Sequence, residues 1–309
     1  MKNILVTGAN GMLGSALQKE ITSIGKNVFP HTRKISDLGV YDSDNNLEKY
    51  IMDNQVDSII HCAAKVGGVM ANMNSNSDFF RENVAINNEI LETALKYGVS
   101  NLVSILSTCI FPNENITYPL TADQLDNGKP HDSNSGYSYA KRLLYYQTKM
   151  YREFTGQNWI SIVPTNLYGE NDNYHLENSH LIPALIRKAY EASLSGDKFY
   201  VWGDGTPLRQ FLYSEDLSKV ILYAIENWKS DKPFMAVNPI EYSIKDVATI
   251  IADRFDLLDR IEYQTDKPSG QFRKPASTDI PSDFEFTSLE TGLNKSIDWF
   301  IANYDTCRK

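Results

Sequence analysis

The stretch ILVTGANGMLG, residues 4–14, joins a short apolar run to three glycines in the spacing Gly-x-x-Gly-x-x-Gly. An apolar-periodic segment continues to about Ile24, so we expect a strand, a tight turn and a helix. Glycines at such a turn let backbone N–H groups approach a pyrophosphate at the start of the helix. Turns also use glycine for steric reasons alone, but this position between strand and helix favours nucleotide binding.

The rest of the first half alternates strand-like and helix-like segments. Apolar runs at 27–32, 56–64, 102–106 and 159–163 read as strands, and residues 83–97 have the apolar period of a helix. Strands that are apolar almost throughout are typical of a parallel sheet covered on both faces. We therefore predict an α/β fold with a Rossmann-type, doubly wound parallel sheet.

The pattern changes after about residue 170, where polar loops separate shorter elements. Helices are predicted at 243–255, with Ser243 as its N-cap, and at 289–304. We expect residues 1–170 to form a dinucleotide-binding Rossmann domain and residues 171–309 to form mainly a smaller α/β substrate-binding domain. The segments 199–202 and 234–237 could each return to the main sheet.

Composition excludes several classes of protein. The chain has 309 residues, 42% hydrophobic and 22% charged, with a net charge of −9, which argues against a general nucleic-acid or membrane-surface binder. No apolar run approaches the roughly 20 residues of a membrane span. The first residues have no basic segment followed by a cleavage site, so we expect a cytoplasmic protein. Three cysteines without a CxxC pair suggest neither a disulfide framework nor a zinc site, and we predict no metal.

The residues after the second strand bear on the choice of cofactor. NAD sites usually carry an acidic residue there to bind the ribose hydroxyls. Here Arg33 and Lys34 follow instead, and a cation at this place suits the 2′-phosphate of NADP. The two could also be an ordinary solvated pair, but we favour NADP over NAD.

A Tyr-x-x-x-Lys element, Tyr137 and Lys141, lies on a predicted helix. Positions i and i+4 share a helix face, so we expect the ammonium to lower the pKa of the phenol, which could then protonate a carbonyl oxygen. Two other elements have this spacing. Only this one follows a strand that ends in hydroxyl side chains, of which Ser107 could bind a substrate carbonyl.

These residues, together with the glycine turn, resemble the extended short-chain dehydrogenase/reductases. The resemblance is sharpest to the GDP-L-fucose synthase family, in blocks at 63–68, 107–112, 164–169, 178–183, 201–205 and 209–211. It runs in order from Asn3 to the last residues. It implies a homodimeric enzyme that uses NADPH for 3,5-epimerisation and 4-reduction of GDP-4-keto-6-deoxy-D-mannose.

The resemblance also implies roles for individual residues. Tyr137 would donate a proton to the C4 oxygen, Lys141 would activate it, and Ser107 would orient the keto group. Cys109 and His180 would be the epimerising pair, since the protons on C3 and C5 are acidified by the keto group between them. The remaining contacts would be cofactor-binding Gly8, Asn10, Gly11, Met12, Leu13, Gly14, Arg33, Lys141, Pro164, Asn166, Leu167 and His180, and substrate-binding Lys188, Trp202 and Arg209.

Alternatives stay open at this point. A related GDP-4-keto-sugar enzyme of the deoxyheptose or colitose type would share the catalytic set, and a non-catalytic NADP-binding protein could keep the fold. Without the family context, Cys109 would be read as a small buried residue and His180 as a surface one. Ser269 stands where the family usually has Asp, which weakens any ligand contact in that loop.

Overall fold

Both faces of the first strand are buried, and this determines the layered architecture. In the computed structural model, which describes residues 1–40, 46–267 and 272–309, strand β1 spans Asn3–Thr7. Its Ile4 and Val6 side chains enter one core and Leu5 enters another, all fully buried. Because side chains alternate along a strand, a run that is apolar at every position needs cover on both faces.

The main sheet confirms the predicted doubly wound α/β fold. It has six strands in the order β2 (Asn27–His31), β1, β3 (Ser58–His61), β4 (Asn101–Ile105), β5 (Asn158–Pro164) and β9 (Phe234–Ala236). Every neighbouring pair is parallel. The chain order reverses between β1 and β3, and ligands of such sheets bind at the carboxyl ends of strands beside this reversal.

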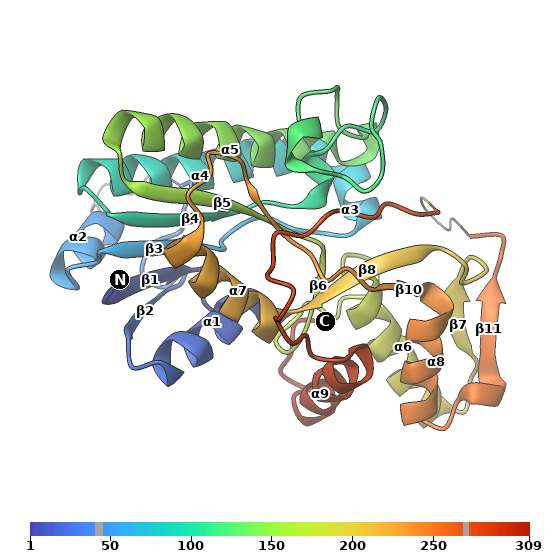
Figure 1. The fold of residues 1–309 in the computed structure, drawn as a ribbon. Helices are drawn as coiled ribbons and strands as arrows, with labels where there is room; N and C mark the ends of the chain where they lie inside the picture. The colour runs from blue at the N-terminus through green and yellow to red at the C-terminus, as the bar shows by residue number, and fades with distance from the viewer. Residues whose placement is uncertain (41–45, 268–271) are drawn as a thin grey trace.

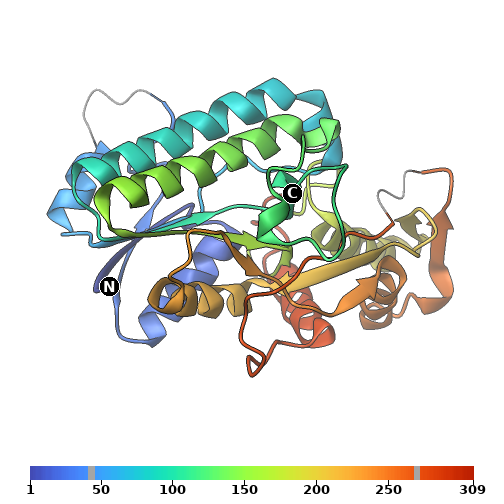
Figure 2. The same ribbon diagram turned by 45° about the horizontal axis from the view of Figure 1, so that its top comes forward.

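Helices cover the sheet on both sides (Figure 1). The long helices α4 and α5 lie side by side over one face, as Figure 2 also shows, while α1 and α7 pack together over the other. The helices of this part of the chain are α1 (Met12–Ser23), α2 (Asn46–Asp53), α3 (Val69–Asn74), α4 (Asn76–Lys96), α5 (Ser135–Thr155) and α7 (Ser214–Asn227).

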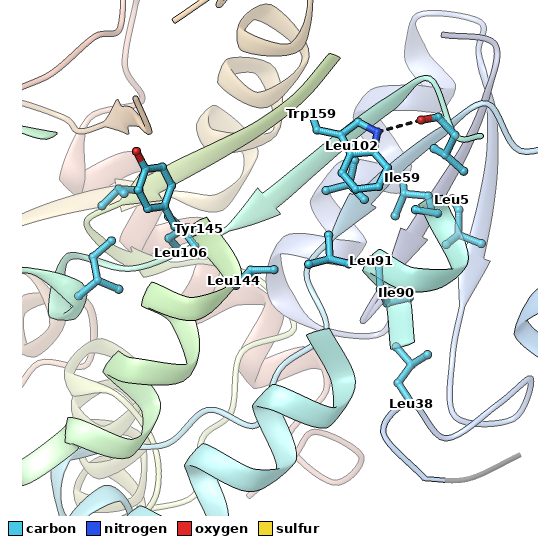
Figure 3. Close-up of a cluster of buried hydrophobic side chains, with 14 of the residues drawn as sticks. Leu5, Leu38, Ile59, Ile90, Leu91, Leu102, Leu106, Leu144, Tyr145 and Trp159 are labelled. Carbon is cyan, nitrogen blue, oxygen red and sulfur yellow. Dashed lines mark hydrogen bonds between the residues drawn. The ribbon is translucent and has the colours of Figure 1, made fainter. Parts of the chain in front are cut away.

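The core beneath α4 and α5 combines apolar packing with a satisfied buried polar atom. Leu5, Ile59, Leu102 and Trp159 from four successive strands meet Leu91 and its neighbours on the helices (Figure 3). The indole nitrogen of Trp159 donates a hydrogen bond of 2.8 Å to the Val99 carbonyl. A large side chain is thereby buried without leaving its one donor unpaired.

The chain after β5 builds a second, smaller unit with its own apolar core. Its elements are β6 (Asn166–Tyr168), α6 (Leu181–Ser195), β7 (Phe199–Trp202), β8 (Leu208–Tyr213), β10 (Glu241–Ser243), α8 (Ile244–Arg254), β11 (Ile261–Gln264) and α9 (Leu289–Ala302). The predicted N-cap of α8 is confirmed, since Ser243 and Asp246 form a reciprocal capping box. None of the described helices is long and apolar enough to cross a membrane.

The two segments that could return to the main sheet behave differently. Residues of β9 pair with β5 and extend the sheet, whereas β7 pairs in parallel with β11 in a separate two-stranded sheet. Strand β8 lies between β10 and β6 in a third sheet. The chain therefore passes back to the first core after residue 170, through α7 and β9.

A buried histidine connects the first turn to the helices above the sheet. Thr7 Oγ1 accepts hydrogen bonds from the backbone N–H groups of Cys62 and Ala63, and it lies 2.8 Å from His61 Nδ1. With both lone pairs engaged, the hydroxyl donates to Nδ1, so the imidazole is neutral with its hydrogen on Nε2. That nitrogen donates to Asn87 Oδ1 at 3.1 Å. Burial lowers the pKa of His61 to about 3.

This arrangement predicts acid-sensitive stability. An unfolded histidine takes up a proton near pH 6.5, whereas folded His61 does so only near pH 3. The stabilising effect is therefore complete above pH 6.5 and is lost as the pH falls from 6.5 toward 3. His31, whose pKa burial lowers to about 4, acts in the same direction. Between pH 6.5 and 5, the free energy of unfolding should fall less steeply in His61→Gln than in wild type, by roughly 1.4 kcal/mol per pH unit. Urea unfolding measures this free energy.

His131→Gln is the matched control, because His131 is exposed and interacts only locally with Ser133 in the bonds described. It should retain the wild-type dependence on pH. An identical dependence in His61→Gln and wild type would contradict the role given to His61.

Candidate active site

The glycine turn is shaped by close backbone contacts. Gly8 has a φ of +64°, and a Cβ there would lie 3.0 Å from the backbone of Ala63 at the end of β3. A Cβ on Gly14 would lie 2.3 Å from the Gly8 carbonyl oxygen. Glycine is thus needed at both positions, once for conformation and once for close helix–turn packing. Helix α1 begins with Gly11 as N-cap and without a side-chain cap, which leaves its first backbone N–H groups for a ligand.

A cavity of about 780 Å³ extends from this turn along the carboxyl edge of the main sheet. It reaches from the ends of β1 and β2 across β3, β4 and β5 to helix α6 and strand β8. Most of the predicted site residues line it, namely Gly8, Asn10, Gly11, Met12, Leu13, Gly14, Arg33, Ser107, Tyr137, Lys141, Pro164, Asn166, Leu167, His180 and Arg209. Sequence positions up to 201 residues apart are brought together here, as predicted for the edge of a parallel sheet.

Two cations stand where β2 ends. Arg33 and Lys34 both line the cavity. The Arg33 side chain is 91% exposed, and its Nε lies 3.5 Å from Asp37 Oδ1 four residues on. An exposed ion pair of this kind contributes little to stability, so the guanidinium can turn to an anionic ligand at small cost.

The Tyr-x-x-x-Lys element lies on α5 and faces the end of β4. Lys141 is buried, and its Nζ donates a 2.8 Å hydrogen bond to the Ile105 carbonyl. It also lies 5.8 Å from the centre of the Tyr137 ring. Ser107 follows β4 and its Oγ accepts a hydrogen bond of 3.4 Å from Cys109 N. A phenol, an ammonium and a hydroxyl thus meet at one end of the cavity.

The expected lowering of the Tyr137 pKa is wrong for this structure. Burial raises the pKa of Tyr137, and negative charge on Cys109 would raise it further. Burial also lowers the pKa of Lys141, to about 8, while its ammonium is engaged by the Ile105 carbonyl. The tyrosine is therefore a neutral phenol with its proton in place, which is the form that a proton donor requires.

The other predicted residues lie at varying distances from the cavity. His180 is the N-cap of α6 and lines it, whereas Cys109, Lys188 and Trp202 do not. Cys109 is nonetheless close enough to Tyr137 and Lys141 to influence the pKa values of both. Lys188 Nζ sits 5.0 Å from the centre of the Trp202 ring. Ser269 lies outside the described residues.

Sequence reasoning missed several residues near the site, among them Asp172, Lys274 and Arg308. Asp172 and Arg308 line the cavity. Burial lowers the pKa of Lys274, and a charged Cys109 would raise it, so this ammonium lies close to the thiol. Each comes from an irregular segment with no motif. The only available signal was that Asp172 closely follows a predicted strand end, where parallel sheets bind ligands.

Comparison with known proteins agrees with this geometry. The model of the NAD dependent epimerase/dehydratase family matches residues 4–238. The chain belongs to that family. A probable GDP-L-fucose synthase of Drosophila melanogaster is 39% identical to this chain over the full length of both. A GDP-L-colitose synthase of Yersinia pseudotuberculosis is 30% identical, over 96% of this chain and 97% of its own.

A solved structure supports the fold. The GDP-L-fucose synthetase of Naegleria fowleri, in a crystal structure bound to NADP, superposes with a TM-score of 0.92 at 36% identity. The match covers 100% of this chain and 95% of the other. The epimerase/dehydratase fold therefore extends through the C-terminal unit, beyond the residues that the family model covers.

Because Gly14 packs directly on the turn, Gly14→Ala should move α1 away from Gly8. We expect it to destabilise the protein by about 1–3 kcal/mol and to weaken dinucleotide binding. Urea unfolding and a fluorescence titration with NADPH measure the two effects. Gly128→Ala is the control, since a Cβ there meets nothing closer than 3.5 Å. A Gly14→Ala variant as stable as wild type would contradict the packing argument.

Proposed function

We propose that the chain catalyses the NADPH-dependent 3,5-epimerisation and 4-reduction of GDP-4-keto-6-deoxy-D-mannose to GDP-L-fucose. The observation that carries this proposal is the shared cavity. Tyr137, Lys141 and Ser107 line the same cavity as the glycine turn, and His180 and Arg209 line its other side. A pure binding protein needs no such set of acids, bases and cations.

The residues present fit NADP(H). The uncapped start of α1 and the close turn at Gly8 suit its pyrophosphate, and Arg33 and Lys34 suit its 2′-phosphate. Asn10, Met12 and Leu13 of the turn would contact it, as would Pro164, Asn166 and Leu167 after β5. When bound, this cofactor supplies the hydride for reduction.

In the reduction, the chain provides the proton and holds the ketone. Ser107 would orient the C4 keto oxygen, and Tyr137 would donate its phenolic proton to that oxygen as hydride arrives at C4. Lys141 would stabilise the phenolate left behind and contact the cofactor ribose. The buried, protonated state of Tyr137 supports this order of events.

In the epimerisation, the Cys109 thiolate would remove the proton from C3 and from C5, each activated by the keto group. His180 would return a proton to the opposite face, and would also contact the cofactor. The Lys274 ammonium lies near Cys109, as the influence of a charged Cys109 on the Lys274 pKa shows.

The GDP-sugar would extend toward the second unit. Lys188, Trp202 and Arg209 lie on α6, β7 and β8, and supply two cations and an exposed ring. This supports assigning cofactor binding to residues 1–170 and substrate binding mainly to residues 171–309, with α7 and β9 as returns to the first core. A net charge of −9 makes such local cations necessary for a diphosphate ligand.

We also propose a cytoplasmic homodimer. Tyr139, Leu143, Met150 and Phe154 form an exposed apolar stripe along α5, and Phe154 is 82% exposed. Their spacings of four, seven and four residues keep them on one helix face, which suits helix pairing between two copies. The three free cysteines are compatible with a reducing compartment.

The two half-reactions should separate in a Tyr137→Phe variant. It lacks the proton donor, so 4-reduction should slow by about 100-fold or more. Exchange of the C3 and C5 protons with D₂O should continue, because Cys109 and His180 remain. NADPH absorbance and NMR of the GDP-4-keto-6-deoxy-D-mannose incubated in D₂O measure the two steps.

Cys109→Ser is the reciprocal variant and should lose most deuterium incorporation at both carbons. Reduction at the wild-type rate in Tyr137→Phe would remove Tyr137 from the mechanism. Undiminished exchange in Cys109→Ser would return Cys109 to a packing role. A different reduced sugar from the wild type would favour the colitose- or heptose-type alternative.

A further inference from the structure

Asp172 is a buried carboxylate in the cavity that the proposed chemistry does not use. Asp172 is only 7% exposed, yet it forms part of the cavity wall. Oδ1 accepts a hydrogen bond of 2.7 Å from the backbone N–H of Asn173. Oδ2 is buried and has no hydrogen-bond partner among the described residues. A buried carboxylate oxygen without a donor is costly, and its presence calls for a functional reason.

His180 lies in the same cavity as this carboxylate. It is exposed to this cavity from the start of α6. Burial raises the pKa of Asp172, and among the effects that lower it, positive charge on His180 is the largest. The two groups therefore interact through space, although no hydrogen bond joins them in the described structure.

The loop that carries Asp172 is held on both sides. Gly169 packs against the Ser214 side chain, where a Cβ would lie 2.1 Å from the hydroxyl oxygen. The segment around Arg308 runs parallel to the loop, with Tyr174 N donating to the Arg308 carbonyl at 2.7 Å and Arg308 donating to the Asn171 carbonyl at 2.9 Å. A carboxylate fixed in this way can orient a hydrogen-bond donor beside it.

We propose that Asp172 is a positioning residue for His180: it accepts a hydrogen bond from the imidazole and holds it, protonated, toward the substrate. This inference rests on the proposed role of His180 as the acid that returns the proton in epimerisation. The carboxylate keeps its charge throughout, and the proton that leaves His180 goes to the substrate carbon.

Other charged groups act on the pair. Arg308 faces Asp172 from the last segment of the chain and lowers its pKa, and Tyr174 lies near it on the same loop. Lys141 and Arg209 line the cavity as well. These cations lie around the pair, and Asp172 Oδ2, which has no partner among the described residues, offers the imidazole a hydrogen-bond acceptor among them.

The test compares wild type with Asp172→Asn, which keeps the shape and the bond from Asn173 but removes the charge. In ¹⁵N-labelled protein without substrate, the His180 ring signals, assigned with His180→Gln, should show a hydrogen-bonded N–H in wild type. That bond should be lost in Asp172→Asn. In D₂O, the rate at which the C3 and C5 protons of the sugar exchange should be about tenfold lower in Asp172→Asn than in wild type above pH 8. In the pH profile of this rate, the decline at alkaline pH should begin about 1 pH unit lower.

Asp216→Asn is the matched control. Asp216 is also buried, with a pKa raised by burial, but it binds Thr287 away from the cavity. It should leave the His180 signals and the position of the alkaline limb unchanged. In the His180→Gln background, Asp172→Asn should cause no further loss of exchange.

Unchanged His180 ring signals in Asp172→Asn would overturn the inference. If Asp172→Asn did not fold, the wild-type spectrum alone would decide. Wild-type ring signals that show no hydrogen-bonded N–H on His180 would then overturn the inference. The NMR result does not depend on turnover, so a wild type that fails to act on the GDP-sugar would refute the proposed function and leave the positioning inference decided by the ring signals.

Discussion

The Thr7 hydroxyl is the point on which the arrangement of the site depends. It accepts hydrogen bonds from the backbone N–H groups of Cys62 and Ala63, just after β3, and donates one to His61. His61 in turn donates a hydrogen bond to Asn87 on α4. Asn87 Nδ2 donates one of 3.4 Å to the Ala140 carbonyl on α5. One hydroxyl thereby joins the glycine turn to the helix that carries Tyr137 and Lys141. Such a buried network rigidifies its surroundings only while every member is satisfied, which is why the imidazole must stay neutral.

This network explains how one cavity can hold two kinds of chemistry. The proposed reduction depends on α5 keeping a fixed distance from the cofactor turn, and the network spans that distance. The proposed epimerisation depends on side chains outside the network, since Cys109 follows β4 and His180 begins α6. The reductive group is thus part of the rigid core, whereas the acid comes from the second unit and, in the inference above, needs Asp172 to hold it.

Much of the fold could be predicted because its signals are local. Apolar runs such as 159–163 identified buried strands, and Ser243 with Asp246 identified a helix start. Helix α4 was harder, because it begins at Asn76, well before the predicted Asn83. The missed residues 76–82 include one buried apolar side chain, Phe79, so no apolar period marks this part of the helix.

The remainder depended on distant contacts. The pairing of β9 with β5 and of β7 with β11 is a choice between similar short apolar runs, and nothing local separates them. The hydrogen bond from Lys141 to the Ile105 carbonyl joins residues 36 apart in sequence. The pKa of Tyr137 is raised by burial, which also arises only in the assembled fold. Motifs could suggest candidate catalytic residues, but the protonation of a residue such as Tyr137 follows from burial, which only the assembled structure contains.

The measurement that tests the central claim most directly is turnover of GDP-4-keto-6-deoxy-D-mannose by the wild-type protein with NADPH, followed by NMR of the sugar. The account predicts GDP-L-fucose, inverted at C3 and C5 and reduced at C4, with one NADPH oxidised per sugar. A reduced sugar that keeps its original configuration at C3 and C5, or no reaction while NADPH binds, would contradict it.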